Sequence, residues 1–149
     1  ATGFVGGQLV EQLFLHEGAK VRVFIHRWNK AAYVSRFDVE YVQGNIFDAE
    51  SMIEASKGCD YIMPLPITGG GTCEESIANS EKAIDALMLA ARENNVKHVV
   101  NVSSVVVHGE TVPNDLSADS PLVAYDDAYA AGKLAAEKRF WKLLDEYCI

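Results

Sequence analysis

The chain has 149 residues, 49% of them hydrophobic and 23% charged, a balance typical of one folded globular domain. Its net charge of −8 argues against a nucleic-acid partner, because nucleic-acid binding requires a strongly basic face. No apolar run approaches the length of a membrane-spanning helix, so we expect neither a nucleic-acid nor a membrane partner. The cysteines (Cys59, Cys73 and Cys148) are odd in number and widely spaced. They predict no metal site and no disulfide framework, and they favour a reducing, cytoplasmic location.

Helical and strand patterns alternate along the chain. In chain order we expect a helix from the opening glycines to Gly18, a strand at 20–26, a short helix at 29–36, a strand at 39–42, a helix at 48–56, a strand at 61–65, a helix at 74–94, a strand at 98–103, a loop at 105–124 and a helix at 125–147. The strand HVVNVS at 98–103 is almost wholly apolar, which is typical of a parallel sheet covered on both faces. The alternation predicts an α/β fold with right-handed crossovers.

The opening segment ATGFVGG places Gly3 and Gly6 directly before an amphipathic helix. Such a turn lets the backbone approach a pyrophosphate, and the helix N-terminus supplies free amides and the positive end of a dipole. We expect the amides of Phe4 and Val5 to point at the phosphates. Many glycine pairs before helices are only turns, so this pattern alone leaves both interpretations open.

ATGFVG resembles the later part of the pattern G-A-T-G-F-V-G, which opens many extended short-chain dehydrogenases/reductases. The resemblance implies a Rossmann-type, doubly wound parallel sheet, with residues 1–149 forming one NAD(P)-binding domain. It also implies a central strand before Ala1 and a substrate domain after the last residue. We therefore expect a fragment that lacks both.

The strand at 20–26 is followed by a basic residue. NAD-preferring enzymes of this type carry an acid at this point, and NADP-preferring enzymes carry a basic residue. Here His26 and Arg27 stand there, and the planar guanidinium of Arg27 suits a phosphate. We expect NADP as the cofactor, with NAD as the alternative. The other interpretation of Arg27 is a solvent-facing side chain without a ligand.

Two later segments resemble cofactor-binding segments of the family. VQGNIFD at 42–48 resembles the adenine-side segment, which implies that Asn45 and Ile46 contact the cofactor. CDYIMPLPITGG, from Cys59, stands where the family often reads D-V-V-F-H-L-A-A, which implies a contact from Leu65. Pro64 and Pro66 depart from that pattern; they remove two amide donors and stiffen the strand end.

VVNVSSVVVHG, from Val99, resembles the ending S-S-x-x-V-Y-G of sugar-nucleotide epimerases. The resemblance puts Ser104 at the catalytic Ser/Thr position, with Ser103 as the less favoured choice. Tyr129 and Lys133 form a Tyr-x-x-x-Lys pair, whose spacing places both side chains on one helix face. Lys133 would stabilise the phenolate and hold the nicotinamide ribose, Tyr129 would exchange a proton with the substrate, and Ser104 would bind the same substrate oxygen.

Together these features predict an NAD(P)-dependent oxidoreductase or epimerase acting on a hydroxyl or carbonyl of a small molecule, such as a nucleotide sugar. Val105 and Val106 stand where dehydratases of the family have acids, which counts against a dehydratase. Two alternatives stay open: a non-catalytic NADP(H)-binding regulatory protein and an inactive, oligomerising fragment. The helices at 74–94 and 125–147 resemble those through which family members form homodimers, so we expect a homodimer.

Overall fold

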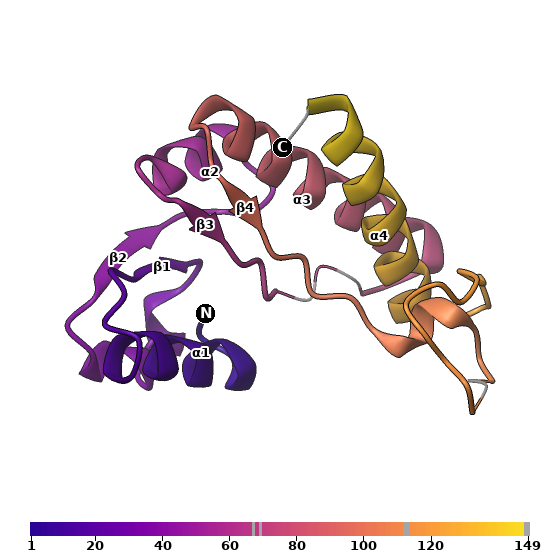
Figure 1. The fold of residues 1–149 in the computed structure, drawn as a ribbon, viewed down its shortest axis with the longest axis horizontal. Helices are drawn as coiled ribbons and strands as arrows, with labels where there is room; N and C mark the ends of the chain where they lie inside the picture. Colours follow the sequence, from indigo (N-terminus) through magenta and orange to yellow (C-terminus); the bar gives the residue numbers. More distant parts are fainter. Residues whose placement is uncertain (67, 69, 112–113, 148–149) are drawn as a thin grey trace.

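The computed structural model describes residues 1–66, 68, 70–111 and 114–147, so that Cys148 lies outside the described part (Figure 1). Its α-helices are α1 (Phe4–Leu15), α2 (Ala49–Ser56), α3 (Cys73–Glu93) and α4 (Ala128–Tyr147). Its strands are β1 (Arg22–Ile25), β2 (Glu40–Gln43), β3 (Tyr61–Ile62) and β4 (His98–Val99). Its short 3-10 helices are η1 (Trp28–Lys30), η2 (Val34–Arg36) and η3 (Val105–His108). The expected order of helices and strands is confirmed.

The strands form two separate parallel pairs. β1 pairs with β2, from Arg22 opposite Glu40 to Ile25 opposite Gln43, and β3 pairs with β4. The parallel α/β fold is thereby confirmed. Among the described residues, no strand joins β1 to β3, so a gap separates the two pairs.

The strands around this gap are shorter than the sequence pattern predicts. The expected strand at 61–65 ends at Ile62 and the expected strand at 98–103 ends at Val99. The carbonyl of Ile62 accepts from the Val100 amide, and strand alternation turns the next position, Pro64, toward β4 as well. Pro64 has no amide to donate, so the ladder stops there.

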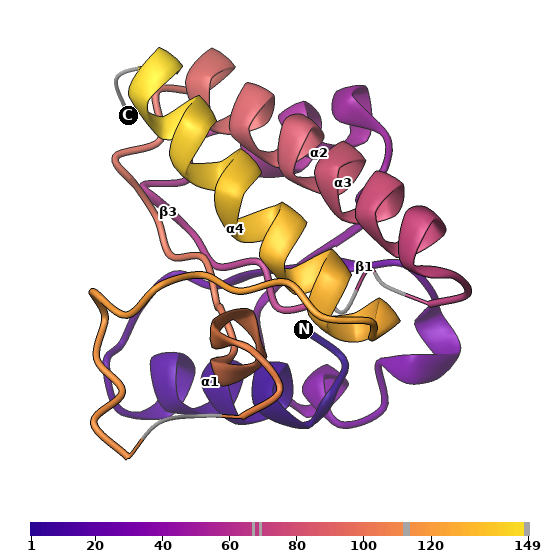
Figure 2. The ribbon, with the colours of Figure 1, turned by 90° about the vertical axis from the view of Figure 1, so that its right-hand side faces the viewer.

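Hydrophobic residues gather in two clusters, one on each side of the gap. The α1 cluster lies between α1, β1 and the segment from η1 to η2, and consists of Val10, Val23, Ile25, Ala31, Val34 and Phe37. The α3 cluster joins α2, α3 and α4, and consists of Met52, Ile84, Ala86, Leu87, Met88, Ala90, Phe140 and Leu143. Figures 1 and 2 show α3 and α4 side by side, with α1 on the other side of the strands. The molecule is thus built as two packed halves.

Side chains fix where the long helices begin. α3 starts with a capping box in which Thr72 Oγ1 accepts from the Glu75 amide and Glu75 accepts from the Thr72 amide. α4 begins at Ala128, three residues later than predicted from the sequence. The reason is Asp127, whose carboxylate accepts from the Ala130 amide at 2.8 Å, as an N-cap residue does.

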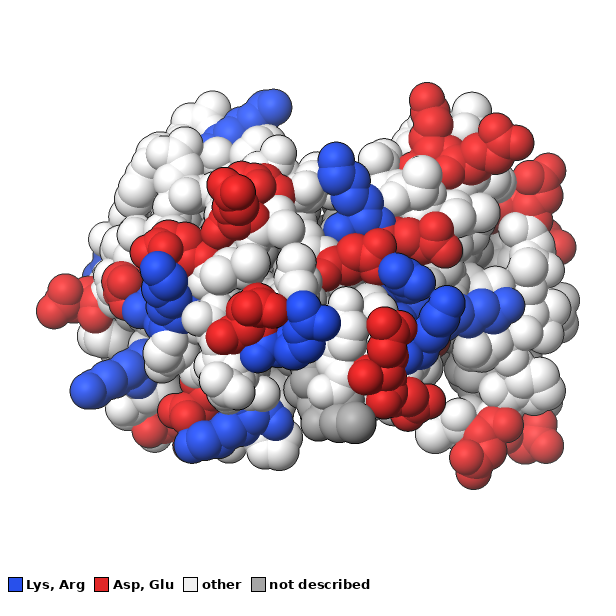
Figure 3. Space-filling model, turned by 90° about the horizontal axis from the view of Figure 1, so that it is seen from above, with Lys and Arg blue, Asp and Glu red and all other residues white. Residues whose placement is uncertain are grey.

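One face of the molecule mixes both signs of charge. Figure 3 shows acidic and basic side chains interspersed over the face above α2, α3 and α4. None of the helices in the described part is long and apolar enough to cross a membrane. The same residues contain no group of three or more metal-ligating side chains placed to hold an ion.

Candidate cofactor and catalytic site

The N-terminus of α1 is open and free of negative charge. Gly3 is the N-cap residue in an extended conformation, and its carbonyl accepts the first helical bond from the Gly7 amide at 2.8 Å. The amides of Phe4, Val5 and Gly6 precede that bond and have no acceptor within the helix. Phe4 is 87% exposed, and the first turn contains no acid. This helix end therefore suits an anion.

The two glycines of this turn play different parts. A Cβ atom at Gly6 would lie 2.6 Å from Ala1 Cα, so only glycine lets the chain fold back over the helix start. A Cβ atom at Gly3 would meet nothing within 4 Å, and its φ of −84° is open to any residue. Neither the backbone nor a neighbour requires glycine at position 3. The space in front of Gly3 is therefore open.

Residues that follow the strands line one cavity of about 390 Å³. Its wall includes His26 after β1, Asn45 and Ile46 after β2, and Leu65 after β3. Ala1 and Thr2, at the start of the glycine turn, complete this end of the cavity. Four of the residues predicted to bind the cofactor are thus brought together. The carboxyl ends of parallel strands are where α/β folds bind ligands.

Arg27 lies just outside this cavity. It is the N-cap residue of η1, with an extended backbone, and is exposed, and its guanidinium has no partner in the described part of the chain. Trp28 beside it donates to Gln43 Oε1 at 2.9 Å, which fixes η1 to the end of β2. Sequence reasoning missed this Trp28–Gln43 contact, because nothing in the spacing of the two residues signals it.

The loop after β2 is shaped by Asn45. The Asn45 side-chain oxygen accepts from the backbone amide of Phe47 at 3.0 Å, and the backbone amide of Asn45 donates to Ser51 Oγ at 3.2 Å. Gly44 before it packs so closely on Ser51 and the Phe24 ring that a Cβ atom would clash with both. The Asn45 side-chain oxygen is therefore used within the loop, and its NH₂ group has no partner in the described part of the chain.

Tyr129 and Lys133 line a second, small cavity of about 40 Å³ between α3 and α4. Lys133 Nζ donates to the Val102 carbonyl at 2.5 Å, which fixes α4 to the segment after β4. Ser104 is the N-cap residue of η3, two residues after Val102, and does not line this cavity. The structure thus brings two of the three predicted catalytic residues to one cavity and leaves Ser104 beside it.

The two cavities share a wall. Ile46, Pro64, Pro66, Thr68 and Leu87 line both of them. The prolines that depart from the family pattern therefore stand between the predicted cofactor residues and the Tyr129–Lys133 pair. Thr68, which sequence reasoning did not single out, is held there by a 2.9 Å hydrogen bond between its hydroxyl and that of Ser80.

Comparison with known proteins shows the family and the fold of this chain. A family model described as NAD(P)H-binding matches residues 1–141. A comparison with curated protein sequences found no match. The predicted NAD(P)-binding family is confirmed by this match, and the predicted Rossmann-type fold is confirmed by solved structures.

Several solved structures have a similar fold. A dTDP-glucose 4,6-dehydratase from Streptomyces venezuelae, with NAD bound, superimposes with a TM-score of 0.82 at 23% identity over 99% of this chain and 51% of that one. A UDP-N-acetylglucosamine 4-epimerase from Bacillus cereus gives 0.80 at 21% identity over 99% and 48%. A triphenylmethane reductase from Citrobacter sp., with NADP(H), gives 0.66 at 19% identity over 96% and 44%. The chain spans about half the length of these proteins.

Proposed function

This chain belongs to the NAD(P)H-binding family, and from that premise we propose that it is the cofactor-binding part of an NADP(H)-dependent oxidoreductase or epimerase. The observation that carries the proposal is the shared wall at Pro64 and Pro66. It sets the strand-end residues for the cofactor beside Tyr129 and Lys133. The cofactor, when bound, supplies the hydride chemistry.

Residues of the glycine turn and of the segments after β1 and β2 bind and orient the cofactor. The free amides of Phe4, Val5 and Gly6 hold the pyrophosphate in the open space in front of Gly3. The NH₂ group of Asn45 donates to the adenine. The unpaired guanidinium of Arg27 binds the phosphate that distinguishes NADP from NAD, because its planar fork matches phosphate oxygens.

Tyr129 moves the substrate proton. It is 38% exposed, so its phenol is within reach of a substrate above the cavity. Lys133 lies one turn further along α4, where its ammonium stabilises the phenolate and its contact with the Val102 carbonyl fixes its position. Ser104, two residues after Val102, binds the same substrate oxygen and stabilises the charge that develops on it.

A hydroxyl or carbonyl of a nucleotide sugar is the proposed substrate group. Among the solved proteins of similar fold are a dehydratase and an epimerase that act on nucleotide sugars. Val105, the first residue of η3, is exposed beside Ser104 where a dehydratase would carry an acid. That side chain favours a reductase or an epimerase.

Titration calorimetry of this chain with NADPH and with NADH tests the cofactor proposal. We expect NADPH to bind at least about tenfold more tightly than NADH, because a charge-assisted hydrogen bond contributes about 1.5–3 kcal/mol. Arg27→Ala should remove the difference while leaving NADH affinity unchanged. Failure of the folded chain to bind either nucleotide would contradict the proposal.

Tyr129→Phe in the full-length enzyme tests the catalytic proposal. Turnover should be abolished while NADPH affinity stays within about twofold, because the phenol reacts with substrate rather than holding the nucleotide. Turnover that survives would assign the proton transfer to another group.

A non-catalytic NADP(H)-binding protein is the second candidate. It is favoured by the size of the Tyr129–Lys133 cavity, about 40 Å³, which holds a few water molecules and no sugar. Full NADPH binding together with no turnover in either the unsubstituted enzyme or Tyr129→Phe would select it. The homodimer stays a prediction; exposed Ile77 on α3 and Trp141 on α4 are the large apolar side chains that such an interface would cover.

A further inference from the structure

The side chain of Gln43, the last residue of β2, contacts the chain on both sides of Arg27. Its Oε1 accepts from the indole N–H of Trp28 at 2.9 Å. Its Nε2 donates to the backbone carbonyl of His26 at 3.5 Å, which is the longer and weaker of the two bonds. One amide side chain thus joins the residues that immediately precede and follow Arg27.

These two bonds begin where the main-chain pairing of β1 and β2 ends. The last pair in register is Ile25 opposite Gln43, and the backbone amide of Gly44 donates to the Ile25 carbonyl at 2.9 Å. His26 is the first residue beyond β1. From there on, the side chain of Gln43 takes over from the main chain and keeps the segment after β1 against the end of β2.

Burial does not hold the start of η1 in place. Residues 26–30 are all exposed, and the first buried anchor that follows them is Ala31, which belongs to the α1 cluster. Within the described part of the chain, the only hydrogen bonds between residues 26–30 and a side chain elsewhere are those of Gln43. The Trp28 ring also lies 5.9 Å from the Tyr41 ring, at a tilted angle. The backbone around Arg27 therefore depends mainly on side chains of β2.

We propose that Gln43 is a positioning residue for cofactor selectivity, which fixes the backbone around Arg27 so that its guanidinium meets the phosphate that distinguishes NADP(H) from NAD(H). This inference rests on the proposed function, in which Arg27 binds that phosphate. Gln43 does not bind the nucleotide itself and acts through Arg27.

A fixed backbone matters here because the Arg27 side chain is long and exposed. Ordering such a side chain on binding costs conformational entropy, and a backbone that also moves adds to that cost. NADPH affinity falls in proportion to the fraction of molecules whose Arg27 is placed to bind. By holding His26 and Trp28, Gln43 keeps this fraction high before the nucleotide arrives. NADH lacks the phosphate, so its affinity does not depend on this fraction.

The neutral amide of glutamine suits this position. The Trp28 indole can only donate and the His26 carbonyl can only accept, whereas one amide group does both at once. A carboxylate at position 43 would lose the bond to the His26 carbonyl. It would also place a negative charge beside Arg27, where it would compete with the phosphate for the guanidinium. Gln43 holds both neighbours of the arginine and leaves its charge free.

Calorimetric titration of Gln43→Met with NADPH and with NADH tests the proposal. Methionine keeps the length of the side chain, removes the donor and leaves only a weak acceptor. We expect NADPH affinity to fall about fivefold, the effect of losing an exposed hydrogen bond or two, and NADH affinity to stay within about twofold. Trp28→Phe, which removes the indole N–H and keeps a ring beside Tyr41, should lower NADPH affinity about threefold.

Tyr41→Phe is the matched control on the same face of β2, two residues before Gln43. The Tyr41 hydroxyl donates to the carbonyls of Val34 at 2.6 Å and Phe37 at 2.7 Å, which holds η2 instead of the start of η1. The variant should unfold at a lower urea concentration and keep the original ratio of NADPH to NADH affinity. A purely structural role of Gln43 would give the same result as this control.

The Arg27→Ala background separates positioning from direct contact. Gln43→Met should cause no further loss of NADPH affinity there, because both substitutions act on one guanidinium. A readout without nucleotide uses Trp141→Phe, which leaves Trp28 as the single tryptophan. Gln43→Met in that background should add a fast, nanosecond component to the fluorescence anisotropy decay of Trp28.

Three results would overturn the proposal. They are full NADPH selectivity in Gln43→Met while Arg27→Ala loses it, the same loss from Gln43→Met with and without Arg27, and a Trp28 anisotropy decay that Gln43→Met does not change. A different pattern marks failure of the proposed function: the unsubstituted chain then shows no preference for NADPH, and Arg27→Ala has no effect. The two failures are therefore distinguishable.

Discussion

Gly132 of α4 packs directly against Ser76 of α3, so closely that a Cβ atom at position 132 would clash with the Ser76 hydroxyl. The same atom would lie 2.9 Å from Ser80 Oγ. Because Gly132 stands between Tyr129 and Lys133, this contact sets the distance at which the Tyr–Lys face of α4 lies from α3.

Gly132→Ala should therefore destabilise the chain. Forcing a methyl group into a packed helix interface costs about 1–3 kcal/mol, which exceeds the helix propensity that alanine gains over glycine. The free energy of unfolding from urea denaturation measures the change. A variant as stable as the original would show that α4 can move away from α3 at no loss.

Gly3→Ala makes the same substitution as Gly132→Ala, but we expect it to leave stability nearly unchanged. Its Cβ atom meets no protein atom within 4 Å, so stability should change by less than about 0.5 kcal/mol. NADPH affinity should fall at least about tenfold, because the new methyl group occupies the space proposed for the pyrophosphate. Calorimetry on both glycine variants checks this, and unchanged NADPH binding by Gly3→Ala would place the phosphates elsewhere.

Ser76 and Ser80 are both buried on α3 but differ in their hydrogen bonds. Within the described part of the chain, Ser76 Oγ has no partner, whereas the Ser80 hydroxyl contacts that of Thr68. Ser76→Ala should be neutral or stabilising, because it removes an unpaired buried hydroxyl, and Ser80→Ala should lose about 0.5–1.5 kcal/mol. Thermal denaturation of the two variants side by side gives the comparison, and a larger loss in Ser76→Ala would reveal a missing partner.

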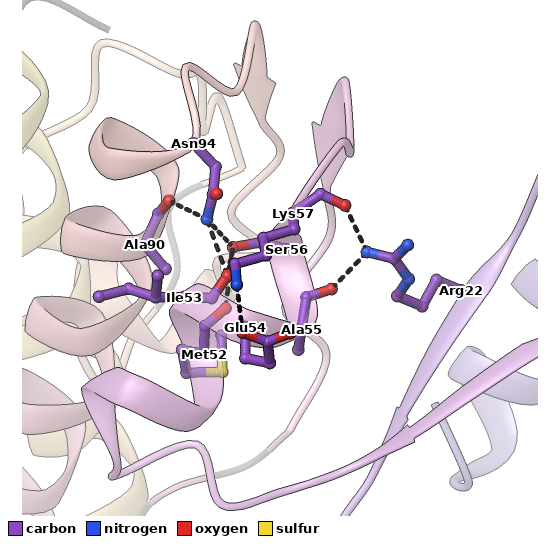
Figure 4. Close-up of polar contacts among 9 residues, drawn as sticks. All are labelled: Arg22, Met52, Ile53, Glu54, Ala55, Ser56, Lys57, Ala90 and Asn94. Carbon is purple, nitrogen blue, oxygen red and sulfur yellow. Dashed lines mark hydrogen bonds and ion pairs between the residues drawn. The ribbon is translucent and has the colours of Figure 1, made fainter.

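Arg22 should contribute more to stability than the exposed ion pairs do. Its hydrogen bonds to the carbonyls of Ala55 and Lys57 tie β1 to the C-terminal end of α2 (Figure 4), and Arg22→Met should lose about 1.5–3 kcal/mol. Lys97→Met, which breaks an exposed pair with Asp60, should lose less than about 1 kcal/mol. Urea denaturation of both variants checks the ranking, and equal losses would mean that Arg22 acts only as a surface charge.

Local patterns in the sequence were enough to predict the order of helices and strands, and the positions of Tyr129 and Lys133 on one helix face. Both depend on residues close together in the chain. The placement of His26, Asn45 and Leu65 in one cavity was predictable too, because each follows a parallel strand and such strand ends meet at one edge.

Contacts between distant residues were not predictable. Nothing near Gly132 in the sequence indicates that Ser76 lies against it, and nothing near Arg22 indicates that it reaches the end of α2. The early end of β3 was also missed, although Pro64 indicates it. Pro64 is the next residue in register to pair with β4, and it has no amide to donate. Such contacts arise when distant parts of the chain pack together, and the residues next to each partner in the sequence do not indicate them.

The Cys73 thiol at the start of α3 should ionise at a higher pH than an ordinary cysteine. Burial raises its pKa, and a hydrogen bond to the Asp126 carboxylate adds to the shift. A raised pKa means less thiolate at a given pH, so alkylation by iodoacetamide should be slow near pH 8 and rise only at higher pH. Asp126→Asn should move the midpoint of that profile down, but not to the ordinary value, since burial is the larger cause.

The measurement uses a Cys59→Ser, Cys148→Ser background, so that Cys73 is the reacting thiol. Asp38→Asn makes the same charge change before β2, in the half of the molecule that contains α1, and should leave the profile unchanged. A midpoint that is the same in Asp126→Asn and in the unsubstituted chain would mean that the carboxylate does not reach the thiol in solution. The segment before α4 would then not be held against the start of α3 as the 3.6 Å contact between Cys73 Sγ and Asp126 Oδ1 indicates.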